Sequence, residues 1–217
     1  MNLREHCKQF LEDIKDPTIF ELGVHWGEDT NGIMSWCNGT VDYHGFEPDS
    51  RNIKEINKAR SNWKPNNSYT IIHGAISDKE CKTPLYLSDG IHALSGNRMT
   101  GANSIRKPHE VVKKFSWIDF SETEEVQTYT IDDYCVDKDI KNIDFIWSDI
   151  QGCEYDMLKG AENMLPYIGI MLLEYSEIEL YKGQKSVNDM LSLLGDNWEL
   201  VAKDSWDIVV RNKTYKK

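Results

Sequence analysis

The sequence has no apolar run of the roughly 18 residues that a membrane-spanning helix needs, which argues against a membrane span. Its first residues, MNLREHCKQFLEDIKD, also lack the apolar core of a signal peptide and have the spacing of an amphipathic helix over residues 2–15. Cysteine is scarce, and the five cysteines, at positions 7, 37, 81, 135 and 153, form no CxxC pair. This pattern argues against a cysteine-based zinc site and is typical of free thiols in a reducing compartment, so we expect a cytoplasmic protein.

An excess of positive charge is also missing. The chain has 25 Lys and Arg against 36 Asp and Glu, a net charge of −11. Proteins that bind duplex nucleic acid rely on clustered cations, so we do not expect duplex nucleic acid as the main partner. The composition, 40% hydrophobic and 28% charged, is that of a globular protein, and 217 residues are enough for one domain, residues 1–217. No part of the sequence specifies an oligomeric state.

Strand-like and helix-like segments alternate along the chain. Apolar, β-branched runs predict strands over 17–23, 41–48, 68–77, 142–150 and 168–177. Helical spacing predicts helices over 29–39, 49–60, 152–165 and 186–196, the last with a capping box formed by Ser186 and Asp189. Two final runs, 197–204 and 206–212, predict a hairpin. The alternation predicts an α/β fold: a mostly parallel twisted sheet with an antiparallel edge hairpin and helices on both faces.

One segment breaks this alternation. Residues 89–120 contain Gly, Ser, Asn, Arg and His without clear periodicity. A loop of this length in a compact domain is usually functional or mobile. We expect it to cover the substrate side of a site as a loop or lid, and we expect residues 124–135 to form a strand that runs into a short turn.

An acidic residue and two glycines lie close together in the sequence where the first predicted strand ends. In IFELGVHWGEDT, Glu21 closes an apolar run, and Gly23 and Gly27 follow four positions apart. Ligands of parallel sheets bind beyond the carboxyl ends of the strands, and glycines let ligand atoms approach the backbone. The next helix, starting near Thr30, directs its positive end to the same space. We expect these four residues to bind a nucleotide-like cofactor; an ordinary strand-to-helix turn is the alternative.

The next two strand ends indicate how an adenosine group would bind. Glu47 ends the second predicted strand about 20 residues after the glycines, where a carboxylate accepts hydrogen bonds from a ribose diol. Pro48 fixes the turn that follows. With the ribose at Glu47, the adenine edge would lie at Ala75 and Ile76 in HGAISD.

The charges near the glycine turn indicate which cofactor it is. The G-x-G-x-x-G motif that seats a pyrophosphate is missing, and Glu28 and Asp29 would repel a diphosphate. S-adenosylmethionine carries a cationic sulfonium and an ammonium group, which two carboxylates tolerate. The pattern therefore favours methyl transfer over hydride transfer.

Three more acids end strands or start a helix later in the chain. Asp149 ends the fourth core strand in DFIWSDIQGCEYDMLKGAENML, Glu154 starts the next helix, and Glu174 ends the fifth strand. Neighbouring parallel strands end at one edge, so these acids predict a catalytic rim. A cap on the helix dipole is the alternative role of Glu154.

This late stretch resembles the signature of the FkbM-type methyltransferases, roughly apolar-K-x-D-x-E-G-x-E-x-x-x-L-x-G-A. The segments FELGVHWGEDT, GFEPDS, GAISD, TIDDY and LLEYSE also occur in the family's order, so the resemblance spans about residues 17–211. It implies a Rossmann-like methyltransferase fold that uses S-adenosylmethionine. It also implies an acceptor hydroxyl, often on a sugar or a natural product.

The resemblance carries over position by position to Glu21, Gly23, Gly27, Glu47, Asp149, Gly152 and Glu154. Three positions depart from the family pattern. His25 replaces a more usual Asn, which puts its expected cofactor contact in doubt, Gln151 replaces an acid, and Ser148 adds a hydroxyl. These departures indicate altered substrate choice or lost activity.

Methyl transfer to a hydroxyl needs a base that removes its proton. Asp149 is the first candidate and Glu174 the second, with His73 and His109 as weaker ones. The residues expected to bind the acceptor are Asn103, Ser104, Arg106, Gln151 and Glu154, with Asn97, Arg98 and Trp117 as further candidates. A divalent cation, Mg²⁺ or Mn²⁺, would suit carboxylate ligands such as Asp149 and Glu174, although no spacing indicates one.

Two alternatives stay open. YCVDK, Tyr134 to Lys138, matches the Y-x-x-x-K pattern of nicotinamide oxidoreductases, but we expect it in a turn and regard the match as coincidental. A non-catalytic Rossmann-like module that binds a glycan or a protein is the other. We favour the transferase, with a small-molecule or glycan acceptor as its partner.

Overall fold

The computed structural model describes residues 2–64, 67–91, 96 and 98–216, so the expectation for Asn97 lies outside the described residues. Its strands are β1 (Thr18–Leu22), β2 (Asp42–Glu47), β3 (Ser68–His73), β4 (Ala75–Ile76), β5 (Lys82–Gly90), β6 (Ile118–Tyr129), β7 (Ile143–Ser148), β8 (Ile168–Glu174), β9 (Trp198–Lys203) and β10 (Asp207–Asn212). Its helices are α1 (Leu3–Glu12), α2 (Thr30–Ser35), α3 (Ser50–Ala59), α4 (Val111–Lys114), α5 (Ile131–Asp137), α6 (Glu154–Lys159) and α7 (Val187–Leu194), with 3-10 turns η1 (Arg60–Asn62) and η2 (Leu165–Tyr167).

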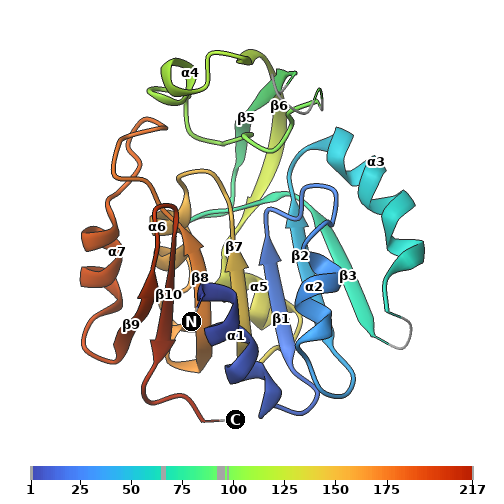
Figure 1. Ribbon diagram of the computed structural model, residues 1–217, viewed down its shortest axis with the longest axis vertical. Coiled ribbons are helices and arrows are strands. Elements are labelled where there is room, and N and C mark those ends of the chain that lie inside the picture. Colours follow the sequence, from blue (N-terminus) through green and yellow to red (C-terminus); the bar gives the residue numbers. More distant parts are fainter. Residues whose placement is uncertain (1, 65–66, 92–95, 97, 217) are drawn as a thin grey trace.

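The central sheet has the predicted mixed topology. Over the described residues, seven strands lie in the order β3-β2-β1-β7-β8-β10-β9. The five from β3 to β8 in this order pair in parallel, whereas β10 is antiparallel to both β8 and β9. The arrows in Figure 1 show that the parallel strands end at one common edge. The prediction of a Rossmann-like α/β fold with an antiparallel edge hairpin is therefore confirmed.

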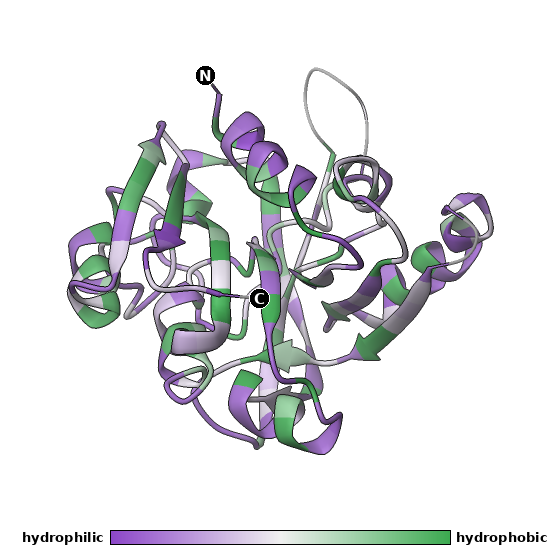
Figure 2. Cartoon of the chain, turned by 90° about the horizontal axis from the view of Figure 1, so that it is seen from below, coloured by the Kyte–Doolittle hydropathy of each residue, from purple (hydrophilic) through white to green (hydrophobic). Residues whose placement is uncertain are grey.

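Helices cover both faces of this sheet because strand side chains alternate between them. On one face, Ile19 and Phe145 pack in a core that includes residues of α1, α2 and α3. On the other, Phe20 and Ile146 pack with residues of α5, α6 and α7. Figure 2 shows hydrophobic and hydrophilic residues mixed along the surrounding helices, as expected for helices that bury one side.

A second sheet, β4-β6-β5, was not predicted. Strands β5 and β6 pair antiparallel and rise beyond the carboxyl edge of the main sheet (Figure 1). Most of β6 is exposed or half-buried, so its sequence lacks the apolar run of a core strand. The expected irregular segment 89–120 is shorter than predicted, since β5 extends to Gly90, α4 lies within it and β6 starts at Ile118.

Two local predictions were wrong. The predicted strand 68–77 is divided at Gly74, where an added Cβ would lie 2.5 Å from the ring of Tyr129. The predicted turn after Tyr129 is helix α5, whose Thr130 cap accepts a hydrogen bond from the backbone N–H of Asp133. Tyr134 therefore lies on a helix and packs in the core with α6 and α7.

The predicted capping box at α7 is confirmed. Ser186 accepts from the backbone N–H of Asp189, and the Asp189 carboxylate accepts from the backbone N–H of Ser186. Replacing Ser186 with Ala should lower the free energy of unfolding by about 1 kcal/mol. Ser192→Ala, at an exposed position within the same helix, should leave stability unchanged or slightly higher, because Ala favours helix. Urea unfolding of both variants is the measurement, and equal losses would contradict the capping role.

Candidate active site

A cavity opens at the carboxyl ends of β1, β2 and β7. The turns after β1 and β7 form part of its wall, and residues 100–105 cover it from the side of the second sheet. Of the predicted cofactor-binding residues, the lining contains Glu21, Gly23, His25, Glu47, Pro48, Ala75, Ile76 and Asp149. Gly27 and Thr30 are not among the described lining residues.

Three protein donors hold Glu47 at the end of β2. Its carboxylate accepts hydrogen bonds from the backbone N–H groups of His25 at 2.8 Å and Asp49 at 2.9 Å, and from the side-chain amide of Asn52 at 3.1 Å. Burial raises the pKa of Glu47 to about 7, although these donors oppose the shift. A carboxylate offers about four acceptor sites, so capacity remains for a ligand hydroxyl.

An apolar wall lies next to Glu47. It is formed by Phe46, Ala75 and Ile76 from the ends of β2 and β4, and by Leu85 and Ile105 from the second sheet and its loop. These side chains suit the flat faces of an aromatic ring better than a charged group. The second sheet thus supplies part of the surface that was predicted to take an adenine.

Glu21 is turned into the protein between β1 and α2. The carboxylate accepts from the hydroxyls of Tyr43 at 2.6 Å and Thr30 at 2.9 Å. Burial is the main reason that the pKa of Glu21 rises to about 8. Thr30, predicted to contact the cofactor, is fully buried and supports Glu21.

Gly23 lets the turn after β1 approach the end of β7. Its φ is 84°, and an added Cβ would lie 2.0 Å from the carbonyl oxygen of Asp149. The backbone N–H of Asp149 donates to the carbonyl of Leu22 at 2.9 Å, which extends the pairing of the two strands. The glycine therefore places the turn and Asp149 side by side at the cavity.

A side-chain cluster of Asp149, Gln151, Glu174 and Tyr181 lies near the ends of β7 and β8, and Asp149 and Gln151 line the cavity there. The Gln151 amide nitrogen donates to Asp149 at 2.5 Å and to Glu174 at 2.9 Å. The Gln151 amide oxygen lies 2.8 Å from the Tyr181 hydroxyl, which can donate to it. The φ of Gln151 is 53°, an unfavourable conformation for a residue other than glycine. Gln151 thus connects the two predicted catalytic carboxyls.

Asp149 is the carboxyl of this pair that faces the cavity. It lines the cavity, whereas Glu174 is not among the described lining residues. Partial desolvation raises the pKa of Asp149, even though its side chain is exposed to the cavity, and the hydrogen bond from Gln151 opposes this shift. Burial and then the charges of Asp149 and Glu154 raise the pKa of Glu174 well above its ordinary value. Both carboxyls therefore favour the protonated form more than free side chains do, and Asp149 is the one that lines the cavity.

The residues predicted to bind the acceptor are not all at the cavity. Asn103, Ser104 and Gln151 line it, and the Ser104 hydroxyl donates to the backbone carbonyl of Gln151 at 2.8 Å. Arg106 is not in the described lining and forms an ion pair with Asp156 at 2.5 Å. Arg106 thus holds its own loop against α6.

Glu154 is also placed outside the described lining. It is 3% exposed, and its carboxylate accepts from the backbone N–H of Ile150 at 3.0 Å. Burial raises its pKa to about 8. The side chain closes the turn between β7 and α6, a structural role that differs from the helix cap considered for it, because Ile150 precedes α6 and that helix has no side-chain cap hydrogen bond.

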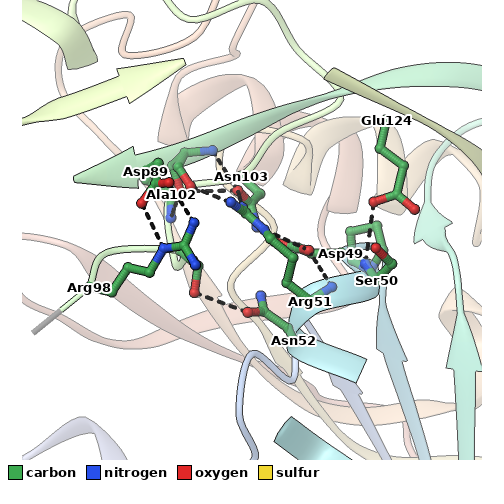
Figure 3. A network of polar contacts seen from close by, with 12 residues as sticks. Asp49, Ser50, Arg51, Asn52, Asp89, Arg98, Ala102, Asn103 and Glu124 are labelled. Carbon is green, nitrogen blue, oxygen red and sulfur yellow. Dashed lines mark hydrogen bonds and ion pairs between the residues drawn. The ribbon is translucent and has the colours of Figure 1, made fainter. Parts of the chain in front are cut away.

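Polar contacts fasten the segment over the cavity to the start of α3 (Figure 3). Asp49, which is fully buried, accepts from the side-chain amide of Asn103 at 2.8 Å. Asn52 accepts from the Thr100 hydroxyl at 3.0 Å. Because Asn52 also donates to Glu47, the covering segment and the predicted ribose contact are parts of one network.

Asn52, Thr100 and Tyr181 were missed by sequence reasoning. Asn52 follows Glu47 by five residues on the first turn of α3, a signal that could have been used. Thr100 and Tyr181 have no comparable sequence signal, because only the folded chain brings them to the cavity and to Gln151.

The remaining sequence candidates lie elsewhere. His73 and His109 are not among the described lining residues. His73 hydrogen-bonds to the backbone carbonyl of Pro48, and His109 to that of Glu179. Arg98 pairs with Asp89 at 2.6 Å on β5.

Ser148 and Trp117 do not contribute to the described wall of the cavity either. Ser148, the hydroxyl that departs from the family pattern, is fully buried, and its Oγ has no hydrogen-bond partner among the described residues. Trp117 packs against Phe115 with ring centroids 5.5 Å apart.

The part of the chain that the structure describes contains neither a metal-site cluster nor a helix that could span a membrane. There, no three His, Cys, Asp or Glu side chains are grouped as a metal site would require. None of the helices in that part combines the length and the hydrophobicity needed to cross a bilayer.

Comparison with known proteins identifies the family. Residues 21–204 match the methyltransferase FkbM domain. The chain belongs to the FkbM methyltransferase family. The resemblance seen in the sequence motifs is thus confirmed, with the matched range inside the predicted 17–211.

Comparisons with individual proteins agree with the match to the FkbM family. The chain is 30% identical over 201 residues to the 2-O-methyltransferase NoeI of Sinorhizobium fredii (strain NBRC 101917 / NGR234), covering 91% of this chain and 80% of that protein. An FkbM methyltransferase of Methylobacillus flagellatus KT superposes with a TM-score of 0.56 and 16% identity over 92% of this chain. This chain spans only 44% of that protein. An rRNA methylase of Streptococcus thermophilus has a TM-score of 0.52 and 9% identity, covering 98% and 97% of the two chains, and shows likeness of fold alone.

Gly23 provides a test of the turn at the cavity. Gly23→Ala should lower the free energy of unfolding by about 2 kcal/mol or more, because the new methyl group meets the Asp149 backbone at a positive φ. In Gly32→Ala, the methyl group meets nothing within 4 Å, and the helix should gain about 0.5–1 kcal/mol. Denaturant unfolding compares the two, and a stable Gly23→Ala variant would refute the close approach.

The buried carboxyls predict how stability depends on pH. An unfolded glutamate ionises near pH 4.5, whereas burial keeps Glu21 protonated to about pH 8. Between these values the folded state binds more protons than the unfolded state, so the free energy of unfolding should fall as the pH rises. Glu21→Gln should make this slope shallower, and Glu162→Gln, at an exposed position, should not. Urea unfolding at several pH values between 5 and 9 measures the slopes, and an identical slope for Glu21→Gln would contradict the assignment.

Proposed function

We propose that this protein is an S-adenosylmethionine-dependent O-methyltransferase that acts on a hydroxyl group of a sugar or glycan. The observation that carries the proposal is the Asp149 carboxylate, which faces the cavity while the Gln151 amide donates both to it and to the neighbouring Glu174. A carboxylate in this position suits the removal of a proton from an acceptor hydroxyl. The 2-O-methyltransferase among the relatives supports oxygen as the acceptor atom.

The described lining of the cavity fits a cationic cofactor. It contains five acidic side chains and neither Lys nor Arg: Glu21, Glu28, Asp29, Glu47 and Asp149. Glu21 keeps its proton up to about pH 8, so the negative charge of the wall comes from the other acids, which favour a ligand with positive charge and oppose a pyrophosphate. When bound, S-adenosylmethionine would supply an electrophilic methyl group. Glu47 would hold its ribose, the apolar wall its adenine, and the acids near Gly23 its cationic end.

The protein's own residues account for the remaining chemistry. Asp149 takes the proton from the acceptor hydroxyl, which makes the oxygen a better nucleophile. Gln151 fixes the Asp149 carboxylate, and Glu174 keeps its proton and so adds no second negative charge. Within the predicted lid 89–120, residues 100–105 cover the cavity, and we assign Asn103 and Ser104 among them to the acceptor side. A positioned base of this kind contributes about 10²–10⁴-fold to the rate.

The structure gives little support to the two alternative functions, a nicotinamide oxidoreductase and a non-catalytic binding module. Tyr134 of the Y-x-x-x-K match hydrogen-bonds to His44 at 2.9 Å within the core and is not among the described lining residues. This position does not suit a catalytic tyrosine. A binding module without activity would keep the same cavity, and turnover is the property that separates it from an enzyme.

Asp149→Asn tests the proposed base. It should lower turnover at least about 10²-fold, because the amide accepts no proton, while the affinity for S-adenosylmethionine changes little. Asp196→Asn, at an exposed position after α7, serves as the matched control. Methyl transfer from labelled cofactor to a panel of sugars, phenols and small alcohols gives the rate, and calorimetry gives the affinity. Full turnover by Asp149→Asn would exclude Asp149 as the base, and no cofactor binding by the native protein would exclude the function.

A further inference from the structure

The proposed cofactor carries one negative group that the cavity wall leaves unmatched. S-adenosylmethionine ends in an α-amino acid, so its cationic groups are accompanied by a carboxylate. The described lining residues include no Lys or Arg to pair with it. A carboxylate next to the ionised acids of this wall is unfavourable unless a cation lies at the rim.

Arg4 is a cation at this rim. The Arg4 guanidinium lies 3.1 Å from the carboxylate of Asp29 and 4.8 Å from the ring centroid of Trp147. Asp29 and Trp147 both line the cavity. Figure 1 shows α1 lying across the face of the sheet, with its N-terminal end nearer the carboxyl edge. Arg4 is not itself among the described lining residues, but both of its partners are, so the helix places Arg4 beside the wall of the cavity.

Asp207 gives further evidence that Arg4 lies at this edge of the sheet. Burial raises the pKa of Asp207 to about 6, and the charge of Arg4 is near enough to oppose the shift. Asp207 pairs with Glu174 across β10 and β8. Arg4 therefore lies on the same side of the sheet edge as Asp149 and Glu174, the pair of carboxyls joined by Gln151.

The strand order determines which end of the cofactor would reach Arg4. The predicted adenine wall and Glu47 lie at the end of β2 and beside it. Strand β1 lies between β2 and β7, and Trp147 belongs to β7. A ligand with its ribose at Glu47 and its adenine on the apolar wall must extend past Gly23 toward β7. Its amino acid end is then the part that approaches Arg4.

We propose that Arg4 forms the carboxylate subsite of the cofactor cavity, binding the α-carboxylate of the methyl donor. The inference rests on the proposed function. The ion pair with Asp29 engages Nη1, and a guanidinium carries five N–H donors, so a second carboxylate can be bound at the same time. The ring of Trp147 restrains the guanidinium and lowers the entropy lost on binding. Arg4 precedes the family match, which begins at residue 21, so the family pattern does not assign this role.

Two neutral ligands that differ in the amino acid end provide the test. S-adenosylhomocysteine has the α-carboxylate, whereas 5′-methylthioadenosine has the same nucleoside and thioether without it. Arg4→Gln should weaken S-adenosylhomocysteine binding about tenfold, and binding of methylthioadenosine should stay within about twofold of the native protein. Arg4→Lys should retain part of the affinity for S-adenosylhomocysteine, because it keeps the charge but loses the planar fork. Isothermal titration calorimetry measures all of these affinities.

Lys8→Gln is the matched control. Lys8 is a second cation on α1, it pairs with Glu12, and its replacement changes the net charge by the same amount. It should leave the binding of both ligands unchanged. Thermal unfolding should give similar midpoints for Arg4→Gln and Lys8→Gln, since 57% of the Arg4 side chain and 41% of the Lys8 side chain are exposed.

The outcomes separate this inference from the proposed function. Native affinity for S-adenosylhomocysteine in Arg4→Gln would overturn the role of Arg4 and leave the transferase proposal intact. Equal weakening of both ligands would also overturn it, because Arg4 would then act by shaping the pocket through Asp29 and Trp147. A native protein that binds neither ligand would refute the transferase proposal itself.

Discussion

The mutual repulsion of carboxylates at one edge of a sheet is the constraint on which this site depends. Strands β1, β2, β7 and β8 each end in or next to an acid, and neighbouring strands bring these acids close together. Buried carboxylates cost free energy unless donors or cations compensate. Glu21, Glu47 and Glu154 are compensated by donors from the protein itself. Asp149 and Glu174 instead share the amide of Gln151, which leaves them the most responsive to a ligand.

The acids at the sheet edge therefore have different roles, which depend on how many protein donors each one has. Those with several protein donors fix the turns after β1, β2 and β7, and they set the shape of the cavity. The pair joined by Gln151 has raised pKa values, because burial and, at Glu174, the charge of Asp149 favour the protonated form. Gln151 is important here because an amide can donate to both carboxyls, whereas the acid usual in the family would add a third charge. The substitution thus makes the pair compatible with a protonated Glu174 and a charged Asp149.

The sequence alone predicted where the strands end. It did not predict which segments far apart in the sequence contact each other. Glu21, Glu47 and Asp149 could be placed at one edge because parallel strands end together. The β5–β6 sheet could not be predicted, because exposed strands such as β6, with FSETEE, lack a core-facing pattern. Helix α5 was missed because its seven residues carry too short an apolar period.

Packing also determines where Arg106 and Glu154 lie at the site. Arg106 suits a hydroxyl-rich ligand by residue type, yet its partner Asp156 lies 50 positions away and takes the guanidinium. Glu154 closes the turn before α6 by accepting from the backbone N–H of Ile150, a role that differs from the helix cap considered for it. The pairing of side chains across long separations in sequence depends on packing, which residue type does not specify.

Two segments outside the main α/β units close the cavity at opposite ends. Thr100 ties the covering loop to Asn52 and, through it, to Glu47. Helix α1 brings Arg4 to the other end, against Asp29 and Trp147. The acids proposed to meet the charge of the ligand thus lie on the sheet edge and in the turn after β1, whereas the covering loop and Arg4 belong to peripheral elements. Since peripheral elements accept change at little cost to the core, the acceptor preference of such a site can change while its acidic edge is kept.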